Sequence, residues 1–417
     1  MAQLRSVNAK GDTFRLSKID GRTSVHLDMM RGLAAIVVCV THLRITFFQD
    51  APHVAHQTAL SKAFYFLTRF GPEAVIVFFV LSGLFVGSSV LKAHANNRWS
   101  WTPYLVARLT RLYLVLIPAL LLGMLWDRLG VAFFGVHSIY GSATFFAQPL
   151  DDTFGRAFAN VLFLQTITGP TFGTNYALWS LSNEFWYYML FPLALLCVLR
   201  SVAPAKRLLA LLASGAIVLF VGSHITAYFA VWLLGALVGL VPLSPRLVRS
   251  PRARRALLAI VLAAFALSAS IARLWGTNPH VGYWTFFAVN LILGATTAAF
   301  VHLSAYDTGQ IATHGWNLYR RVARLLSHSS YTLYLVHTPL LVFLSAWLLP
   351  GAQWLPDLKH LLLGCVILTV VVAYAYIISR LTEYRTDKVR AFAMRIVGRT
   401  SLAAQTTTSS AEAIRKA

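Results

Sequence analysis

Apolar runs of about twenty residues recur along the chain from Leu27 to about Leu381, with short polar stretches between them. A helix needs about 20 apolar residues to cross the hydrocarbon core of a bilayer, so each run predicts one membrane-spanning helix. The predicted spans are 27–47, 70–91, 104–126, 176–199, 207–222, 224–242, 255–275, 283–303, 327–349 and 360–381. Little more than Gly222-Ser223-His224 separates the fifth from the sixth. One long helix is the alternative there, and we favour a tight hairpin.

Composition supports the same fold class. Of 417 residues, 57% are hydrophobic and 12% are charged, which is typical of an all-α, polytopic membrane helical bundle. We divide the chain into an N-terminal tail (1–26), a transmembrane domain (27–381) and a C-terminal tail (382–417) that is disordered in part, from Ser401 onward. The N-terminal tail holds no short apolar core ending in a cleavage site, so we expect no cleavable signal peptide.

The formal net charge of +22 is largely a topology signal. Basic residues lie between the spans and form no single basic domain, which argues against nucleic-acid binding. With the N-terminus inside, 29 of the 36 Lys and Arg residues fall in predicted cytoplasmic segments, as the positive-inside rule requires. The sequence therefore predicts a multi-pass protein of the plasma (inner) membrane with both termini in the cytoplasm. Three cysteines within apolar runs show no metal-ligand spacing, so we expect no metal.

The first span carries three ionisable residues, Asp28, Arg31 and His42. On a helix with about 100° per residue, the eleven positions from Arg31 to His42 leave the two side chains roughly 20° apart around the axis and about 16 Å apart along it. Ionisable side chains inside a span are costly and usually face a protein interior or a water-filled cavity. This face is therefore the first candidate for function.

Charged residues in the third and fourth spans are the next candidates. Arg108 and Arg111 lie one helical turn apart at the predicted cytoplasmic edge. Such a pair suits phosphate oxygens, because guanidinium groups bind them bidentately and stay charged. Arginines that only set the topology and extend toward the membrane surface are the alternative. Glu184 lies near the eighth residue of its span, at a level comparable to His42, and is either functional or a structural helix–helix hydrogen bond.

Polar residues in the second and ninth spans complete the set. Ser82 belongs to a Ser-Gly pair among aromatic residues, a pattern that by default indicates close helix packing. In the ninth span, Tyr331, Tyr334 and His337 share one helical face at spacings of three residues. A lone histidine in a span is more often a hydrogen-bonded strut than a catalyst. Together with His42, however, His337 suggests a polar tunnel through the bundle.

These motifs together resemble the membrane-bound acyltransferase-3 family. The stretches that carry the resemblance are LDMMRGLAAIVVCVTH in the first span, FFVLSGLF in the second, RLTR at the start of the third, LWSLSNEFWYYMLFPL in the fourth and SYTLYLVH in the ninth. Each is weak alone. Five of them in family order on ten spans make a specific match, which covers about residues 27–381.

The resemblance implies an integral membrane O-acyltransferase of the sugar-modifying type. Such an enzyme transfers an acyl group, most often acetyl, from cytoplasmic acyl-CoA to a hydroxyl of a glycan or glycolipid, in cell-surface polysaccharide or exopolysaccharide. The resemblance carries the family's essential histidine onto His42, and its arginines onto Arg31, Arg108 and Arg111. Glu184 falls where the family has an acidic residue. One departure is Asn183, where an apolar residue is more usual, and this puts the acceptor preference in doubt.

A mechanism follows as a hypothesis. The residues expected to act in catalysis are His42 and Glu184, those expected to bind the acyl-CoA donor are Arg31, Arg108 and Arg111, and those expected to contact substrate are Asp28, Ser82, Tyr331 and His337. The imidazole of His42 either deprotonates the acceptor hydroxyl or takes the acyl group as an acyl-imidazole. Arg31 stabilises the cofactor or a developing oxyanion, and Glu184 orients the imidazole or binds acceptor hydroxyls.

Two other classes of function remain open at this point. A transporter or flippase that moves a glycan or a small substrate without acyl transfer also needs charged groups inside its spans. It predicts interrupted spans in corresponding halves of the chain, which the sequence does not show. A non-catalytic export or sensory protein is the third class, and the presence of Arg31, His42, Arg108 and Arg111 argues against it.

Overall fold

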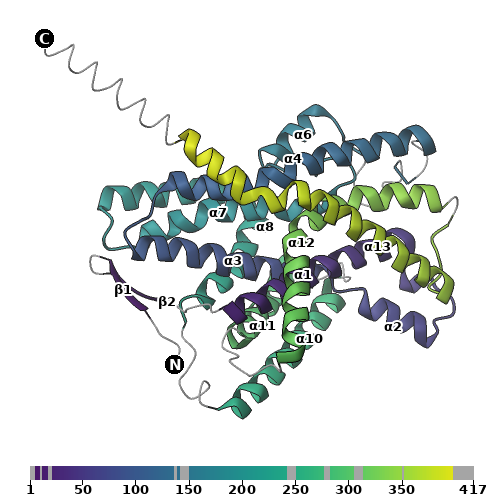
Figure 1. Ribbon diagram of the computed structural model, residues 1–417, viewed down its shortest axis with the longest axis horizontal. Coiled ribbons are helices and arrows are strands. Elements are labelled where there is room, and N and C mark those ends of the chain that lie inside the picture. The colour runs from purple at the N-terminus through teal and green to yellow at the C-terminus, as the bar shows by residue number, and fades with distance from the viewer. Residues whose placement is uncertain are drawn as a thin grey trace, which may run out of the picture.

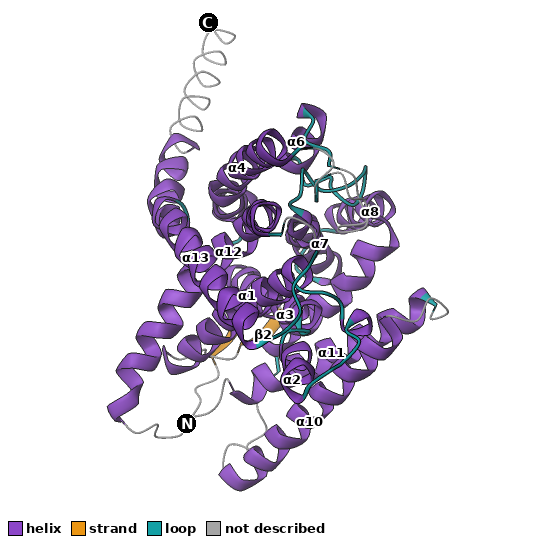
Figure 2. Cartoon of the chain, turned by 90° about the vertical axis from the view of Figure 1, so that its right-hand side faces the viewer, coloured by secondary structure: helices purple, strands orange, loops and turns teal. Residues whose placement is uncertain are grey.

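Long helices make up most of the structure. The computed structural model describes residues 5–9, 12–16, 21–135, 139–140, 150–241, 250–276, 282–304, 313–349 and 352–397. Its long helices are α1 (Gly21–Phe47), α3 (Gly71–Ala95), α4 (Trp101–Phe134), α7 (Trp179–Val198), α8 (Pro204–Val238), α10 (Pro251–Gly276), α11 (Tyr283–Ser304), α12 (Thr313–Leu348) and α13 (Leu358–Leu381). Figure 1 shows many of them side by side, and Figure 2 looks along them. Nine helical segments in the described ranges are long and apolar enough to cross a membrane, which confirms the all-α polytopic fold class.

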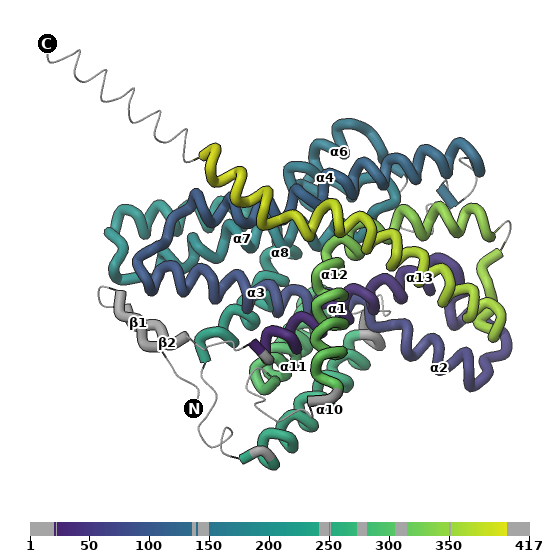
Figure 3. Tube along the Cα trace, viewed as in Figure 1, coloured from purple at the N-terminus to yellow at the C-terminus, as the bar shows by residue number. Residues whose placement is uncertain are grey.

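Shorter elements connect or precede the long helices. They are the strands β1 (Arg5–Ala9) and β2 (Asp12–Leu16), which pair antiparallel, the helices α2 (Ala59–Leu67) and α6 (Phe154–Val161), and the 3-10 turns η1 (Ala51–His53), η2 (Tyr176–Leu178) and η3 (Glu383–Arg385). Two long helices start more than five residues earlier than predicted: α1 begins at Gly21 instead of Leu27, and α12 at Thr313 instead of Ser327. Figure 3 shows the first part of α12 running across the other helices, so this extension adds little to the span itself.

The predicted C-terminal tail begins with ordered structure. After η3 the chain is helical over 386–397. The end of the chain from Ser401, predicted to be disordered, lies outside the described residues.

The chain reverses direction within α8. Its Gly222 has φ 79° and ψ 177°, a conformation that interrupts the helix and that only glycine adopts without steric cost. Before this residue α8 runs antiparallel to α7, because its earlier residue Arg207 contacts Cys197 and its later residue Phe220 contacts Trp186. After Gly222 the chain runs parallel to α7, because Phe229 contacts Tyr187 and the later residue Trp232 contacts the later residue Phe191. The two halves of α8 are therefore two crossings, and the predicted hairpin is confirmed.

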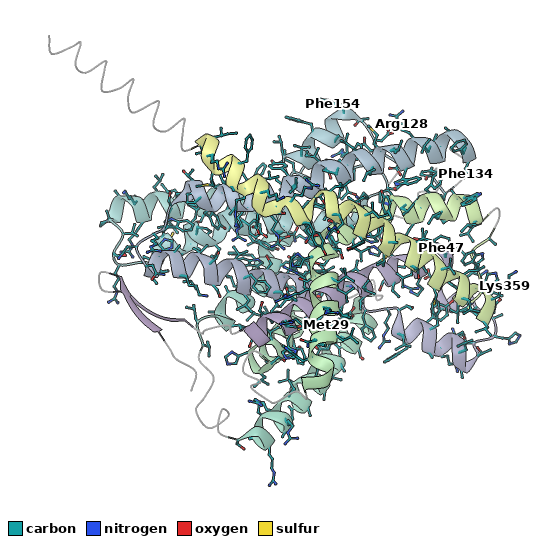
Figure 4. The ribbon with its side chains drawn as sticks, viewed as in Figure 1. Met29, Phe47, Arg128, Phe134, Phe154 and Lys359 are labelled. Atoms are coloured by element: carbon teal, nitrogen blue, oxygen red, sulfur yellow. The ribbon has the colours of Figure 1, made fainter. Side chains whose placement is uncertain are left out.

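The helices consequently make ten crossings, as predicted. Because ten is even, both ends of the helical region lie on the same side of the bundle; that this side is the cytoplasm stays a prediction. The first and ninth of ten alternating crossings should run in the same direction. Contacts between α1 and α12 agree with this, since Arg31 contacts Ser327 and the later residue His42 contacts the later residue His337. Figure 4 likewise labels the end of α1 at Phe47 on the same side of the molecule as the start of α13 at Lys359.

Close helix packing centres on α3 and α8. A Cβ atom added to Gly83 would collide with the carbonyl oxygen of Trp232, and one added to Gly235 would collide with that of Val80. The backbones of the two helices therefore touch directly, which only small residues permit. The Ser-Gly pair of the second span thus does pack against another helix through its glycine, as predicted.

Two helices with an internal proline, α7 and α12, recover the lost hydrogen bond from a side chain. A proline has no N–H, so it leaves the carbonyl oxygen four residues earlier without its helical partner. For Pro192 that oxygen belongs to Tyr188, and the hydroxyl of Tyr104 donates to it at 2.8 Å. For Pro339 it belongs to Leu335, and the side-chain amide of Asn175 donates to it at 2.7 Å. The second of these bonds joins the long connection after α4 to the centre of α12.

Replacing Asn175 with alanine is expected to lower the free energy of unfolding by about 1–3 kcal/mol, because the buried Leu335 carbonyl loses its donor. Thermal unfolding of the purified protein in detergent measures the loss. The control is Asn317→Ala, which removes an exposed amide from α12 and should leave the midpoint unchanged. Equal midpoints for both variants would contradict the role of Asn175.

Candidate active site

One cavity gathers most of the predicted site residues. It lies among α1, α3, α4, α7 and α12 and encloses about 760 Å³ of space, part of it open to solvent. Six of the nine residues predicted from the sequence line it: Arg31, Ser82, Arg108, Arg111, Glu184 and Tyr331. The other three, Asp28, His42 and His337, do not. We call this space the arginine cavity.

Arg31 is fixed at the cavity wall by residues of α1 and α12. Its Nε donates to the hydroxyl of Ser327 at 3.1 Å, and its Nη2 donates to the same oxygen. The carboxylate of Asp28 accepts a hydrogen bond from that hydroxyl at 2.8 Å and pairs with Arg31 Nη2 at 3.4 Å. Asp28 therefore orients the guanidinium group without lining the cavity itself.

Glu184 joins helix packing to the cavity lining. Its Oε1 accepts hydrogen bonds from the hydroxyl of Ser82 at 3.1 Å and from the hydroxyl of Tyr188 one turn along α7. The indole N–H of Trp232 donates to the oxygen of Ser82 at 3.2 Å, so the network reaches α8. Hydrogen bonds of this kind offset the cost of placing a carboxylate inside a bundle. Glu184 thus makes the helix–helix hydrogen bond of the structural interpretation and also lines the cavity, and its functional role stays a prediction.

Two buried polar atoms of the cavity lining have no hydrogen-bond partner among the described residues. They are Nε of Arg108 and the hydroxyl oxygen of Tyr331. The remaining contacts of Arg108 are a long hydrogen bond of 3.4 Å to Ser89 and positions 5.7 and 5.8 Å from the ring centres of Tyr104 and Tyr188. Buried polar atoms normally have partners, so these two point to a polar ligand in the cavity.

His42 lies further along α1 and pairs with His337. Its Nδ1 is 2.7 Å from Nε2 of His337, and the two rings stack with their centres 4.9 Å apart. The other nitrogen of His337, Nδ1, lies 2.9 Å from the carbonyl oxygen of Leu333. The ring of Tyr176 packs 4.6 Å from that of His42. His337 is fully buried and His42 is partly exposed, and both His42 and Arg31 face α12, as their spacing predicted.

Tyr334 stands between the arginine cavity and the histidine pair. It lines the cavity, and its ring centre is 6.2 Å from that of His337. Its hydroxyl is 2.7 Å from that of Ser180, and the ring of Phe78 lies 5.6 Å away. Tyr334 is therefore a side chain that the cavity lining and the surroundings of the histidine pair share.

Glu383 is a site residue that sequence reasoning missed. It lies in η3, and its Oε2 accepts hydrogen bonds from the backbone N–H and the hydroxyl of Thr332, both at 3.1 Å. It also interacts electrostatically with Arg31 and Arg111. The hydrophobicity pattern placed Glu383 in the C-terminal tail, because the last apolar run ends at Leu381. The available signal was an acidic residue next to the last span of a chain with only 14 Asp and Glu in total.

Comparison with known families agrees with this geometry. A family model described as an acyltransferase domain matches residues 25–380. No curated protein and no solved structure gives a significant match. The matched region includes all nine predicted site residues, and of the ten crossings it leaves out only the first four residues of α1 and the last residue of α13. The chain therefore belongs to the acyltransferase-3 family of membrane acyltransferases.

Proposed function

We propose that this membrane acyltransferase takes an acetyl group from acetyl-CoA at the cytoplasmic face of the plasma (inner) membrane and transfers it to a hydroxyl of a glycan or glycolipid. The observation that carries the proposal is the arginine cavity, in which Arg31, Arg108 and Arg111 meet. Glu184 is the single carboxylate of the lining, and Asp28 and Glu383, which interact with Arg31 and Arg111, do not line the cavity. Arg108, whose Nε has no hydrogen-bond partner, is the cation without an acidic partner in the part of the chain that the structure describes. A cavity with this charge favours an anionic ligand, and the phosphates of CoA match guanidinium groups in charge and geometry.

The donor would lie with its phosphates on the arginines and its thioester toward His42. Arg31 and His42 are separated by eleven residues of one helix, which corresponds to about 16 Å. Arg31 is therefore too far from His42 to stabilise an oxyanion formed there, and we assign it to donor binding. The pantetheine arm, which is long and carries no charge, would extend from the arginines past Tyr334 toward His42.

His42 is oriented to act as a base. The carbonyl oxygen of Leu333 only accepts, so Nδ1 of His337 carries a proton and, in the neutral ring, its Nε2 accepts. Nδ1 of His42 then donates to that Nε2, which leaves Nε2 of His42 with a free lone pair. We assign His337 to positioning His42, in place of the substrate contact expected from the sequence.

The reaction proceeds at Nε2 of His42. It removes the proton of the acceptor hydroxyl, the oxygen attacks the thioester carbon, and the C–S bond breaks when the tetrahedral intermediate collapses. The thiolate of CoA leaves and recovers the proton from the imidazolium ring. In an acyl-imidazole route, Nε2 attacks the thioester carbon first, and the C–S bond breaks as the thiolate of CoA leaves. The acceptor oxygen then attacks the acyl carbon, the C–N bond to Nε2 breaks, and the hydroxyl proton passes to the released Nε2 and from there to the thiolate.

Removal of the acceptor atom in His337 tests its positioning role. His337→Gln keeps an oxygen that can accept from Nδ1 of His42, whereas His337→Leu does not. We expect His337→Leu to lower kcat by about 10–100-fold with the KM for acetyl-CoA unchanged, and His337→Gln to retain most activity. Initial rates in proteoliposomes measure both values. Equal losses in the two variants would assign His337 to packing alone.

The proposed function as a whole is tested on cells with and without the gene. Surface and secreted glycans are compared by mass spectrometry, and added acetyl mass is expected only when the protein is present. Added succinyl mass would keep the acceptor class and change the donor. Movement of a glycan across vesicles without acyl-CoA, with no change in glycan mass, would favour a transporter and contradict the proposal.

A further inference from the structure

Aromatic side chains gather where the chain passes from α3 to α4. The ring centres of Trp99 and Trp101 lie 5.4 Å apart, and they lie 5.1 and 6.2 Å, respectively, from the ring centre of Tyr104. Tyr104 is buried, whereas both tryptophans are partly exposed. We call these three residues the aromatic cluster.

The aromatic cluster continues the arginine cavity along one face of α4. From the N-terminus of the helix this face carries Trp101, Tyr104, Arg108 and Arg111. Spacings of three, four and three residues leave the four side chains within about 80° of one another around the axis. Both arginines line the cavity, and the guanidinium carbon of Arg108 lies 5.7 Å from the ring centre of Tyr104. The cluster and the cavity therefore form one continuous surface of α4.

The parts of CoA follow one another in the order of these side chains. From the thioester, the molecule continues through the pantetheine arm and the diphosphate to an adenosine with a 3′-phosphate. As the third crossing, α4 runs in the same direction as α1, so Trp101 lies farther from His42 than Arg108 does. The seven residues from Arg108 to Trp101 correspond to about 10 Å of helix, a length that a nucleotide can span. With the diphosphate on the arginines, the adenosine would reach the aromatic cluster.

The charge around the aromatic cluster suits a phosphate group. Residues 74–126 include no Asp or Glu. Arg98 is exposed and directly precedes Trp99. A turn fixes its backbone at this place, because Asn97 has φ 52° and the N–H of Arg98 donates to the carbonyl oxygen of Ala93 at 2.8 Å. The guanidinium group of Arg98 is thus available at the edge of the cluster to bind a phosphate ester.

Trp101 is the ring of the cluster best placed to stack on a nucleobase. The ring of His94 already stacks on Trp99, with centres 4.6 Å apart and planes at 20°, and Nδ1 of His94 lies 3.1 Å from the carbonyl oxygen of Val90. Trp99 and Tyr104 meet Trp101 at steep interplanar angles of 69° and 76°. Within the described ranges, no aromatic ring is stacked on Trp101. Nucleobases stack on such rings because every base has a flat π-face.

We propose that the aromatic cluster and Arg98 bind the nucleotide part of acetyl-CoA, with the adenine stacked on Trp101 and the 3′-phosphate on Arg98. This assignment rests on the proposed acyl transfer, and it adds how the donor is recognised beyond its diphosphate. Aromatic residues that only anchor helices at the membrane surface are the alternative. An anchor predicts no dependence of binding on the nucleotide.

The test compares three donors that share the acetyl-pantetheine arm and differ in the nucleotide. They are acetyl-CoA, its 3′-dephospho form and acetyl-4′-phosphopantetheine, which lacks the adenosine. Titration calorimetry of the full-length protein in detergent, with a non-hydrolysable analogue of each donor, measures Kd. The variants are Trp101→Leu, Trp101→Phe and Arg98→Ala. The controls are Trp347→Leu, an exposed tryptophan of α12, and Arg200→Ala, an exposed arginine of the connection between α7 and α8.

We expect Trp101→Leu to raise the Kd for the acetyl-CoA analogue by about 10–100-fold, because loss of a stacked base has an effect of this order. Trp101→Phe keeps a flat ring and should raise it by no more than about fivefold. Arg98→Ala should raise it by about tenfold and leave the Kd for the 3′-dephospho analogue unchanged, since that analogue lacks the partner of Arg98. No variant should change the Kd for the phosphopantetheine analogue, and both controls should match wild type.

Each outcome decides between the two proposals. If wild type binds none of the three analogues, donor binding itself is contradicted, and the nucleotide site with it. If wild type binds the acetyl-CoA analogue and Trp101→Leu keeps the wild-type Kd, only the nucleotide site is overturned. Equal losses of Trp101→Leu for the acetyl-CoA and phosphopantetheine analogues would also overturn it, because they would show that Trp101 acts through packing. Equal losses of Arg98→Ala for acetyl-CoA and its 3′-dephospho form would contradict the place of the 3′-phosphate.

Discussion

Replacing His42 with alanine is expected to lower the rate of acyl transfer by about 100- to 10,000-fold, the range that a positioned general base supplies. The imidazole is the one group of the histidine pair that is partly exposed, and its Nε2 is left free by the chain of hydrogen bonds through His337 to Leu333. Alanine removes that lone pair without adding bulk. The variant should still bind acetyl-CoA, because His42 lines no part of the arginine cavity.

The measurement is the initial rate of transfer in membranes that contain equal amounts of each protein. His328→Ala is the matched control, because it removes an exposed histidine from α12 at a distance from the pair. Retained turnover in His42→Ala would contradict the catalytic role. A denaturing gel under acidic quench, after incubation with radiolabelled acetyl-CoA alone, separates the two routes, since only the acyl-imidazole route labels the protein at His42.

Replacing Arg108 and Arg111 together with alanine is expected to weaken acetyl-CoA binding by about 100-fold or more. Each hydrogen bond to a charged group contributes about 1.5 kcal/mol at the low end, and 1.4 kcal/mol corresponds to a factor of ten in Kd. Nε of Arg108 has no partner among the described residues, so its bond to a ligand would replace no existing protein bond. Titration calorimetry in detergent with a non-hydrolysable acetyl-CoA analogue measures Kd.

Salt dependence gives this experiment a second readout. Binding by wild type should weaken as salt rises, because screening reduces the attraction between guanidinium groups and phosphates, and the double variant should show a smaller slope. Arg324→Ala, an exposed arginine of α12, is the control for a general loss of positive charge. An unchanged Kd in the double variant would contradict donor binding by Arg108 and Arg111 and would leave them the role of setting the membrane topology.

The crossings could be predicted from the sequence because hydrophobic length is a local property. Even the hairpin at Gly222 was visible, since a break needs only one residue that tolerates positive φ. The ends of the helices were harder to predict from the sequence. The start of α12 at Thr313 continues the helix into polar sequence, where the apolar run gives no signal. The sequence also does not show which crossings are neighbours, so the contact of α1 with α12 became visible only in the structure.

The candidate site was predicted only where spacing along one helix defined a face. Arg31 and His42 are such a pair, and both do face α12. Glu383 was missed because it lies at the very end of a crossing, where an acidic residue looks like part of a loop. His337 was predicted as a substrate contact, and its contact with His42 was not foreseen because it joins residues 295 positions apart. Long-range contacts of this kind depend on packing and have no signature in a single sequence.

The bond between Arg31 and Ser327 joins residues 296 positions apart and has a consequence for biosynthesis. Insertion into the membrane proceeds from the N-terminus, so α1, α3 and α4 enter the bilayer with all three cavity arginines long before α12 is made. Until α12 and Glu383 arrive, Arg31 has neither Ser327 nor its acidic neighbour on η3, and His42 has no His337. On the proposed roles of His42 and the arginine cavity, the enzyme is therefore expected to be catalytically silent until the last two crossings are in place.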